Sequence, residues 1–267
     1  MAERLPIVKL QPTRVLDWGS FLGASTELLQ RTYPQAQLLA VEPDAVRRDA
    51  TAALLRTPWW SPRRWGGNAP VALSEAELGA GQGQLLWANM ALHGAIDPQA
   101  VMVQWQRALA VDGFLMFSTL GPGSLGLLRE LYAGEGWPAP FAPFVDMHDL
   151  GDMLVHAGFA DPVMDQEQIT LSYTSAEALL AELRTLGGNV AVQRGPGLRT
   201  RRWRARLLRL LESKAAAQGR IARGFERGYG HAFKPPPRPR LAAETSVPLE
   251  DLRAMVRAGR RGAGLAP

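Results

Sequence analysis

The amino-acid sequence predicts an α/β fold, namely a doubly wound, mostly parallel seven-stranded sheet that ends in a C-terminal antiparallel hairpin. Short apolar runs alternate with segments of helical period between residues 14 and 118, which is typical of parallel strands joined by helices. Polar residues directly follow several of these runs, as they do at the ligand-binding edge of such sheets. Two later runs, 162–173 and 223–233, are suited to antiparallel pairing.

The first half of the chain supplies five expected strands and three helices. The run 14–19 ends in an acid and a glycine, which indicates a buried strand followed by a turn. The second run, 37–43, ends in a proline that stops the strand. Asp44 and Asp97 are placed to cap the two helices that follow them. The remaining strands are expected at 69–73, 84–89 and 113–118, and the helices at 22–33, 44–56 and 98–109.

The second half is predicted to complete one domain over residues 1–235, with a basic helical insertion at about 194–222. A cluster of prolines then ends the ordered part of the chain. Residues 236–267 are expected to be a flexible tail rich in proline and arginine, with a short helix at 249–258. The helices of this half are expected at 124–132, 147–157, 175–186 and 198–216.

The net charge of +5 is distributed unevenly along the chain. Residues 1–193 hold 12 Lys and Arg against 20 Asp and Glu, whereas residues 194–240 hold 14 against 2. A basic face of this kind attracts nucleic acid, a membrane surface or an acidic protein. The alternative is a solvated arginine-rich helix without a partner.

The composition excludes several classes of function. The chain has no cysteine, which rules out disulfides, a thiolate nucleophile and cysteine-ligated metals. The N-terminus lacks a signal-peptide core, and no apolar run is long enough for a transmembrane helix. We therefore expect a cytoplasmic protein.

Polar residues at the strand ends form the candidate site. Asp17, Gly19 and Gly23 follow the first strand, where glycines permit a tight turn and a close approach of backbone to a ligand. Glu42 ends the second strand, 19 residues beyond Gly23, where an acid can accept both hydroxyls of a ribose. Asn89 follows a third strand. The alternative is a tight turn beside a surface glutamate.

Other motifs argue against other chemistries. Residues 121–126 match G-x-G-x-x-G but are interpreted as a loop and a helix start, because no acid ends a buried strand about 20 residues later. The sequence has no P-loop, no H-E-x-x-H and no G-x-S-x-G. The four histidines are scattered, so we expect no metal site.

The pattern Asp17-x-Gly19-x-x-x-Gly23, followed by Glu42 and Asn89, resembles the class I S-adenosylmethionine-dependent methyltransferases. Longer stretches are similar to the malonyl-acyl-carrier-protein O-methyltransferase family of biotin synthesis, and the similarity covers roughly residues 5–235. These stretches are 86–93, 113–122, 144–152, 157–165 and 229–232.

The resemblance implies an S-adenosylmethionine cofactor and a carboxyl O-methylation. Asp17, Gly19 and Gly23 would shape the methionine side of the cofactor pocket, Glu42 would bind the ribose, and Asn89 would lie near the donor methyl. No catalytic acid or base is expected, because a carboxylate is already ionised at pH 7 and catalysis then depends on positioning and desolvation. The substrate mouth would be lined by His93, Ser118 and Thr119.

The resemblance also implies a partner, acyl carrier protein, which is acidic and would dock on the basic stretch 194–240. A nucleic-acid methyltransferase is disfavoured, because Asn89-Met90-Ala91-Leu92 is not a base-methylation motif.

The chain departs from the family at three places. Phe21 stands where the loop usually has a glycine, and Gln84 where the strand usually opens with an acid. The helical segment that usually precedes the first strand has no counterpart in residues 1–10. The acid that faces adenine is also not identified, with Ser74, Glu75 and Glu77 as candidates. These departures leave open an alternative, a non-catalytic relative that binds an acidic partner through its basic face.

Overall fold

The computed structural model describes residues 1–237 apart from 22, 57–58, 61–67, 186–188, 194, 196–197 and 216–218. The expected tail lies outside the described residues from position 238 onward, and so does its helix at 249–258. The chain divides into two compact units, Met1–Pro235 and Pro236–Pro267. Among the described residues, no helix is both long and apolar enough to cross a membrane.

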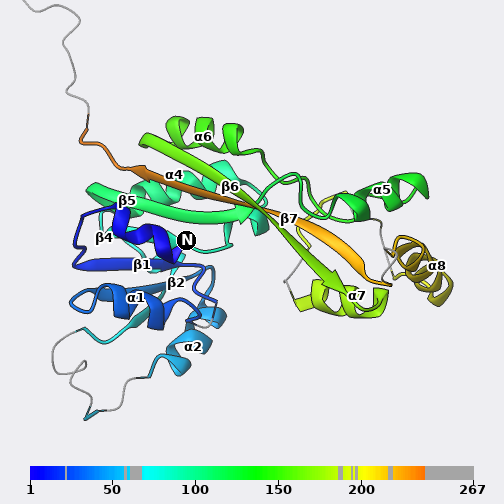
Figure 1. The fold of residues 1–267 in the computed structure, drawn as a ribbon. Helices are drawn as coiled ribbons and strands as arrows, with labels where there is room; N and C mark the ends of the chain where they lie inside the picture. The colour runs from blue at the N-terminus through cyan, green and yellow to red at the C-terminus, as the bar shows by residue number, and fades with distance from the viewer. Residues whose placement is uncertain are drawn as a thin grey trace, which may run out of the picture. The chain divides into compact units, whose positions relative to one another are not determined.

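Seven strands form one sheet in the order β3-β2-β1-β4-β5-β7-β6 (Figure 1). The first five strands run parallel, and β7 pairs antiparallel with both β5 and β6. This arrangement confirms the predicted fold. The strands are β1 Arg14–Trp18, β2 Gln37–Glu42, β3 Val71–Ser74, β4 Gly83–Ala88, β5 Leu109–Leu120, β6 Ala160–Tyr173 and β7 Ile221–Phe233.

Most helices lie where the sequence places them, and both predicted caps are present. Asp44 accepts the Arg47 N–H at 2.8 Å, and Asp97 accepts the Ala100 N–H at 3.0 Å. Within the described residues the α-helices are α1 Thr26–Thr32, α2 Ala45–Leu54, α4 Pro98–Ala108, α5 Gly126–Gly134, α6 Met147–His156, α7 Ala176–Thr185 and α8 Arg201–Glu212. The same part of the chain has the 3₁₀ helices η1 Ala2–Ile7, η2 Glu75–Glu77 and η3 Leu92–Gly94.

Two helices are shorter than predicted. The helix expected from residue 22 begins at Thr26, because Phe21 and Gly23 have positive φ angles of 46° and 77°, which a right-handed helix excludes. The helix expected over 198–216 begins after Thr200, whose hydroxyl accepts the Trp203 N–H.

The strands alternate side chains between two apolar clusters, one on each face of the sheet. Leu16, Leu86 and Leu115 belong to a cluster that α4 and α6 cover, whereas Val15 and Leu85 belong to a cluster that α1 and η1 cover. This period of two is the pattern expected of buried parallel strands. Packing on both faces fixes the strands relative to one another and so fixes the positions of their carboxyl ends, where the candidate site residues lie.

A third apolar cluster involves the long antiparallel strands. It joins β6 and β7 to α5, α7 and α8 through buried residues that include Leu128, Leu179, Leu207 and Phe225. Figure 1 shows these three helices gathered around one end of β6 and β7.

Candidate active site

The candidate residues lie at the carboxyl ends of neighbouring parallel strands. Strand β1 lies between β2 and β4, where the strand order reverses direction, and ligands bind at such a point. The register pairs Trp18 with Val41, and Ala88 with Phe117. One edge of the sheet therefore carries the predicted site residues at similar levels, namely Asp17, Glu42, Asn89 and Ser118.

Asp17 is a buried acid with an unused oxygen. Its residue is 1% exposed, and neither its Oδ2 atom nor the Ser20 hydroxyl has a hydrogen-bond partner among the described residues. Burial raises the pKa of Asp17 to about 7, and the Glu42 charge adds to this shift. Buried polar atoms are normally partnered, so the orphaned pair indicates a place for a polar ligand.

Gly19 follows Asp17 in a conformation that suits glycine. Its φ is +63°, and a Cβ atom there would lie 3.2 Å from the Cβ of Ala91, in the loop after β4. Gly23 has a different role, because a Cβ there would meet Leu55 and Thr26 at 3.0 Å. The space beside Gly23 is thus filled by the chain itself, whereas Gly19 lets the loops after β1 and β4 lie close together.

Phe21 does not fill the glycine loop. Its φ of 46° is the left-handed conformation for which the family's glycine is suited, and the residue is 71% exposed. The departure from the family pattern therefore leaves a strained backbone with a solvent-facing ring. Gln84 lies away from the site, because it is the second residue of β4, near the opposite edge of the sheet, and its Oε1 accepts the Thr13 hydroxyl at 2.9 Å.

Glu42 is not the surface glutamate of the alternative interpretation. It is 2% exposed at the end of β2, and its Oε1 accepts a hydrogen bond of 2.8 Å from the hydroxyl of Thr51. Thr51 lies on α2 and is fully buried. The hydroxyl therefore fixes the direction of the carboxylate.

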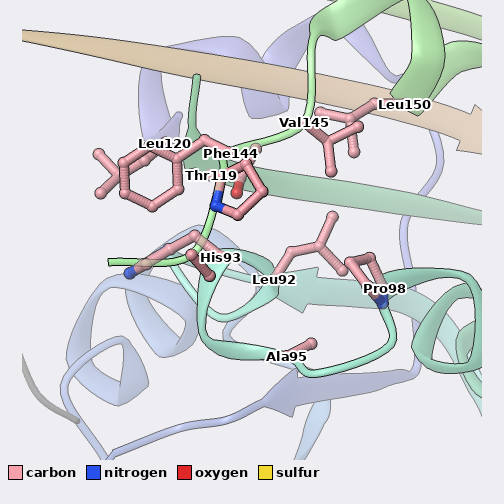
Figure 2. Close-up of a pocket in the computed structure, with 11 residues that line it drawn as sticks. Leu92, His93, Ala95, Pro98, Thr119, Leu120, Phe144, Val145 and Leu150 are labelled. Carbon is pink, nitrogen blue, oxygen red and sulfur yellow. The ribbon is translucent and has the colours of Figure 1, made fainter. Parts of the chain in front are cut away.

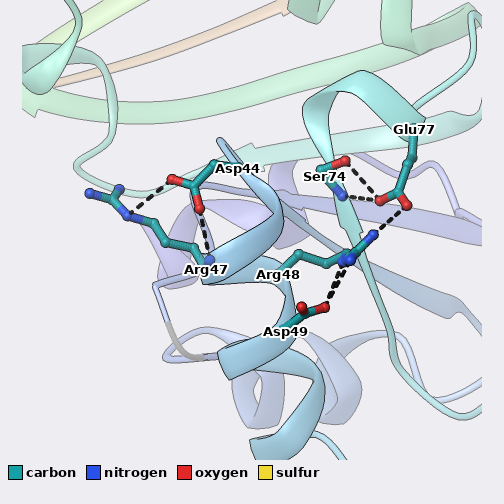
Figure 3. Close-up of polar contacts among 6 residues, drawn as sticks. All are labelled: Asp44, Arg47, Arg48, Asp49, Ser74 and Glu77. Atoms are coloured by element: carbon teal, nitrogen blue, oxygen red, sulfur yellow. Dashed lines mark hydrogen bonds and ion pairs between the residues drawn. The ribbon is translucent and has the colours of Figure 1, made fainter.

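Glu75 and Glu77, the two acids that follow β3, differ in their contacts. The Glu77 carboxylate accepts the N–H of Ser74 at 2.7 Å and its hydroxyl at 2.8 Å, and it also pairs with Arg48 (Figure 3). Glu77 is thus engaged in a capping box. The Glu75 carboxylate forms no hydrogen bond or ion pair within the described residues, and burial raises its pKa.

Asn89 and Met90 are both bound to Ser118. The Ser118 hydroxyl donates to Asn89 Oδ1 at 2.8 Å and accepts the Met90 N–H at 3.0 Å. Ser118 is fully buried, whereas Asn89 is exposed. Ser118 therefore lies beneath Asn89 and is not among the residues that line the pocket described next.

His93 and Thr119 line one small pocket together (Figure 2). Nδ1 of His93 is buried without a hydrogen-bond partner in the described chain, and burial lowers the pKa of this imidazole. The Phe144 ring lies 6.3 Å from the His93 ring in an edge-on arrangement. The other lining residues are Leu92, Ala95, Pro98, Leu120, Ala142, Pro143, Val145 and Leu150.

Comparison with known proteins identifies the family. No protein-family model matches the chain. A malonyl-[acyl-carrier protein] O-methyltransferase from Gallionella capsiferriformans is 40% identical over 243 residues, covering 89% of this chain and 82% of the relative. The protein of that name from Laribacter hongkongensis is 38% identical over 248 residues, covering 90% and 82%. The chain belongs to the malonyl-[acyl-carrier protein] O-methyltransferase family.

Two solved structures have the same fold as this chain. A candidate methyltransferase from Bacillus halodurans aligns with a TM-score of 0.59 at 14% identity, covering 88% of this chain and 98% of its own. The YcgJ protein of Bacillus subtilis aligns with a TM-score of 0.54 at 11% identity, covering 84% and 93%. The class I methyltransferase fold is therefore shared despite little sequence identity.

The G-x-G-x-x-G match of this family member is explained by packing. Cβ atoms at Gly121 and Gly123 would lie 2.0 and 2.5 Å from the carboxylate oxygens of Glu226 on β7. The glycines thus make room for a buried glutamate, which agrees with their interpretation as a loop.

The sequence did not identify the pocket wall at Pro143, Phe144 and Val145. These residues lie in a loop rich in proline and aromatic residues, and the signals in the sequence were this composition and the similarity to the family over residues 144–152.

Proposed function

We propose that this chain transfers a methyl group from S-adenosylmethionine to the free carboxyl group of a malonyl unit carried by acyl carrier protein. The family supports the reaction, because relatives of 38–40% identity carry that name. The observation that carries the cofactor assignment is the buried, unpartnered Asp17 oxygen at the point where the strand order reverses.

The residues at the sheet edge fit this cofactor. Asp17 and Gly19 would hold its amino-acid end, since they combine an orphaned acceptor with a close backbone approach. Glu42 would accept the ribose hydroxyls, with Thr51 keeping its carboxylate in place. Glu75, at the end of β3, would face the adenine end.

The chain's own residues act mainly by positioning. When bound, the cofactor supplies an electrophilic methyl group to a carboxylate oxygen. Malonate carboxylates are ionised at neutral pH, so no residue has to remove a proton. Asn89 would stand beside the donor methyl, held there by Ser118.

The pocket beyond Asn89 would hold the malonyl end of the substrate. His93 and Thr119 supply polar atoms within an otherwise apolar wall. Because burial lowers the pKa of His93, its imidazole is neutral at pH 7 and can orient the acyl group without forming a tight ion pair. The apolar wall excludes water, which strengthens each polar contact.

Two measurements test this proposal. Isothermal titration with S-adenosylhomocysteine is expected to give micromolar affinity, about −8 kcal/mol, and Asp17→Asn to weaken it at least tenfold. Radiolabelled methyl transfer is then expected with malonyl-acyl carrier protein and not with the acetyl form, which lacks the free carboxyl group. No binding at millimolar ligand would favour the non-catalytic alternative. Binding without methyl transfer would refute the proposed substrate.

A further inference from the structure

Helix α8 carries arginines that the rest of the described chain leaves unpaired. Arg206 pairs with Glu135 of α5. The other arginines of α8 are exposed and form no ion pair with any described residue; they are Arg201, Arg202, Arg204 and Arg209. The acid at the end of the helix, Glu212, is already engaged, since it accepts the Ala176 N–H. The basic surface is thus not neutralised within the described chain.

The placement of these charges opposes helix stability. Arg201 and Arg202 lie in the first turn, which contains no acid. The N-terminal end of a helix is itself positive, so cations there are unfavourable and anions favourable. This end therefore concentrates positive charge from two sources, which indicates an acidic partner.

The helix is anchored firmly enough to present these charges. Leu207 and Leu211 are buried in the third apolar cluster. The Trp203 ring packs 5.1 Å from Trp137 and 6.1 Å from Tyr132. A docking surface on a rigid element loses little entropy on binding.

The same cluster reaches the substrate pocket. It contains Leu120, and Phe144 packs against it; both residues line the pocket with His93. Helix α8 and one wall of the pocket therefore belong to a continuous packed region. A partner seated on α8 could deliver a tethered acyl group to the pocket.

We propose that α8 docks the carrier protein through Arg201, Arg202, Arg204 and Arg209, an inference that rests on the proposed function. The expected partner is an acidic protein that carries the malonyl group. Residues 1–193 carry a net −8, from 12 basic and 20 acidic residues. This part of the chain would repel an acidic protein, so electrostatic steering directs it to α8.

The test compares charge reversal on α8 with a matched reversal elsewhere. Arg201→Glu/Arg202→Glu is paired with Arg14→Glu/Arg107→Glu. The second pair changes the net charge equally, at two exposed arginines that lie away from the site and form no ion pair with any described residue. Each variant is assayed with malonyl-acyl carrier protein and with malonyl-N-acetylcysteamine, a thioester that lacks the carrier. The double lysine variant, Arg201→Lys/Arg202→Lys, checks that charge is responsible.

The α8 reversal is expected to lower kcat/KM for the carrier substrate by roughly tenfold or more and to leave the small thioester within about twofold. For the control and the lysine variant, kcat/KM should stay within about twofold of the wild type on both substrates. Added salt should reduce the difference between the wild type and the α8 reversal on the carrier substrate. Equal loss on both substrates, or equal behaviour of α8 and control variants, overturns the inference.

Two further outcomes separate this inference from the proposed function. If the wild type methylates neither thioester, the proposed function fails, and fluorescence anisotropy with labelled malonyl-acyl carrier protein then decides the docking. Carrier binding lost only in the α8 reversal would support the inference. Loss of duplex DNA binding with unchanged carrier kinetics would assign α8 to nucleic acid and overturn it.

Discussion

Ser118 holds Asn89 in place: its fully buried hydroxyl donates a 2.8 Å hydrogen bond to the Oδ1 atom of Asn89. The same hydroxyl accepts the N–H of Met90, whose φ of +55° is strained for a residue with a side chain. One serine on β5 thus fixes both the amide orientation and the backbone turn after β4.

Ser118→Ala is expected to weaken S-adenosylhomocysteine binding several-fold, because the Asn89 amide loses the bond that orients it, and to lower the unfolding free energy by about 1–3 kcal/mol. Titration calorimetry measures the loss of affinity. Ser124→Ala is the matched control, because Ser124 is also fully buried but its hydroxyl bonds to the Glu226 backbone and not to Asn89 or Met90. Equal loss of affinity in both variants would show that only general stability is involved.

Asp17 should make the stability of the ligand-free protein depend on pH. Its folded pKa of about 7 lies above its ordinary value of 3.8. The stability that the protonated Asp17 side chain gives to the folded state is therefore fully present below about pH 4 and is lost as pH rises through about 7. We compare the unfolding free energies of Asp17→Asn and the wild type by urea unfolding. From pH 5 to pH 8.5 this difference is expected to shift by about 1–3 kcal/mol in favour of the variant. A constant difference across this range would contradict the buried ionisation.

Ligand binding should show the opposite trend with pH. S-adenosylhomocysteine carries an ammonium group, which the ionised Asp17 carboxylate attracts more strongly than the protonated form does. Wild-type affinity should rise as pH increases through about 7, whereas Asp17→Asn should show a flatter profile. Calorimetric titrations at several pH values measure both curves, and parallel curves would remove Asp17 from the cofactor site.

Phe21 and Gly19 should respond differently to substitution, although both have positive φ. Phe21→Gly relieves backbone strain at an exposed side chain, so stability should change by less than about 1 kcal/mol and affinity by less than threefold. Gly19→Ala introduces a strained Cβ close to Ala91 and should weaken binding at least tenfold. A large gain of affinity in Phe21→Gly would show that the ring obstructs the cofactor.

Thr51 should affect cofactor binding through its hydrogen bond to Glu42. Thr51→Val keeps the shape of the side chain and removes the hydroxyl bonded to the Glu42 carboxylate. We expect a loss of about 1–3 kcal/mol in unfolding free energy and a several-fold weaker affinity for S-adenosylhomocysteine. Thr185→Val, at an exposed helix end, is the control. Unchanged affinity in Thr51→Val would mean that Glu42 needs no such support.

The succession of strands and helices along the chain, and the polar residues that follow the strands, were readable from the sequence alone. Apolar period and breakers are local signals, so β1, β2 and the caps Asp44 and Asp97 were predicted closely. Asp17, Glu42 and Asn89 were found because parallel strands end at one edge whatever their distance in sequence.

Other features depended on contacts between distant segments. The exposure of Phe21, the support of Asn89 by Ser118, and the packing of Gly121 against Glu226 join residues that no local pattern relates. The separate use of Glu77 and Glu75 likewise depended on where Arg48 of α2 lies. Periodicity determines which residues are buried and where strands end. Which atom a buried polar group meets is decided only when strands and helices pack, because hydrogen bonds depend on distances that sequence spacing does not encode.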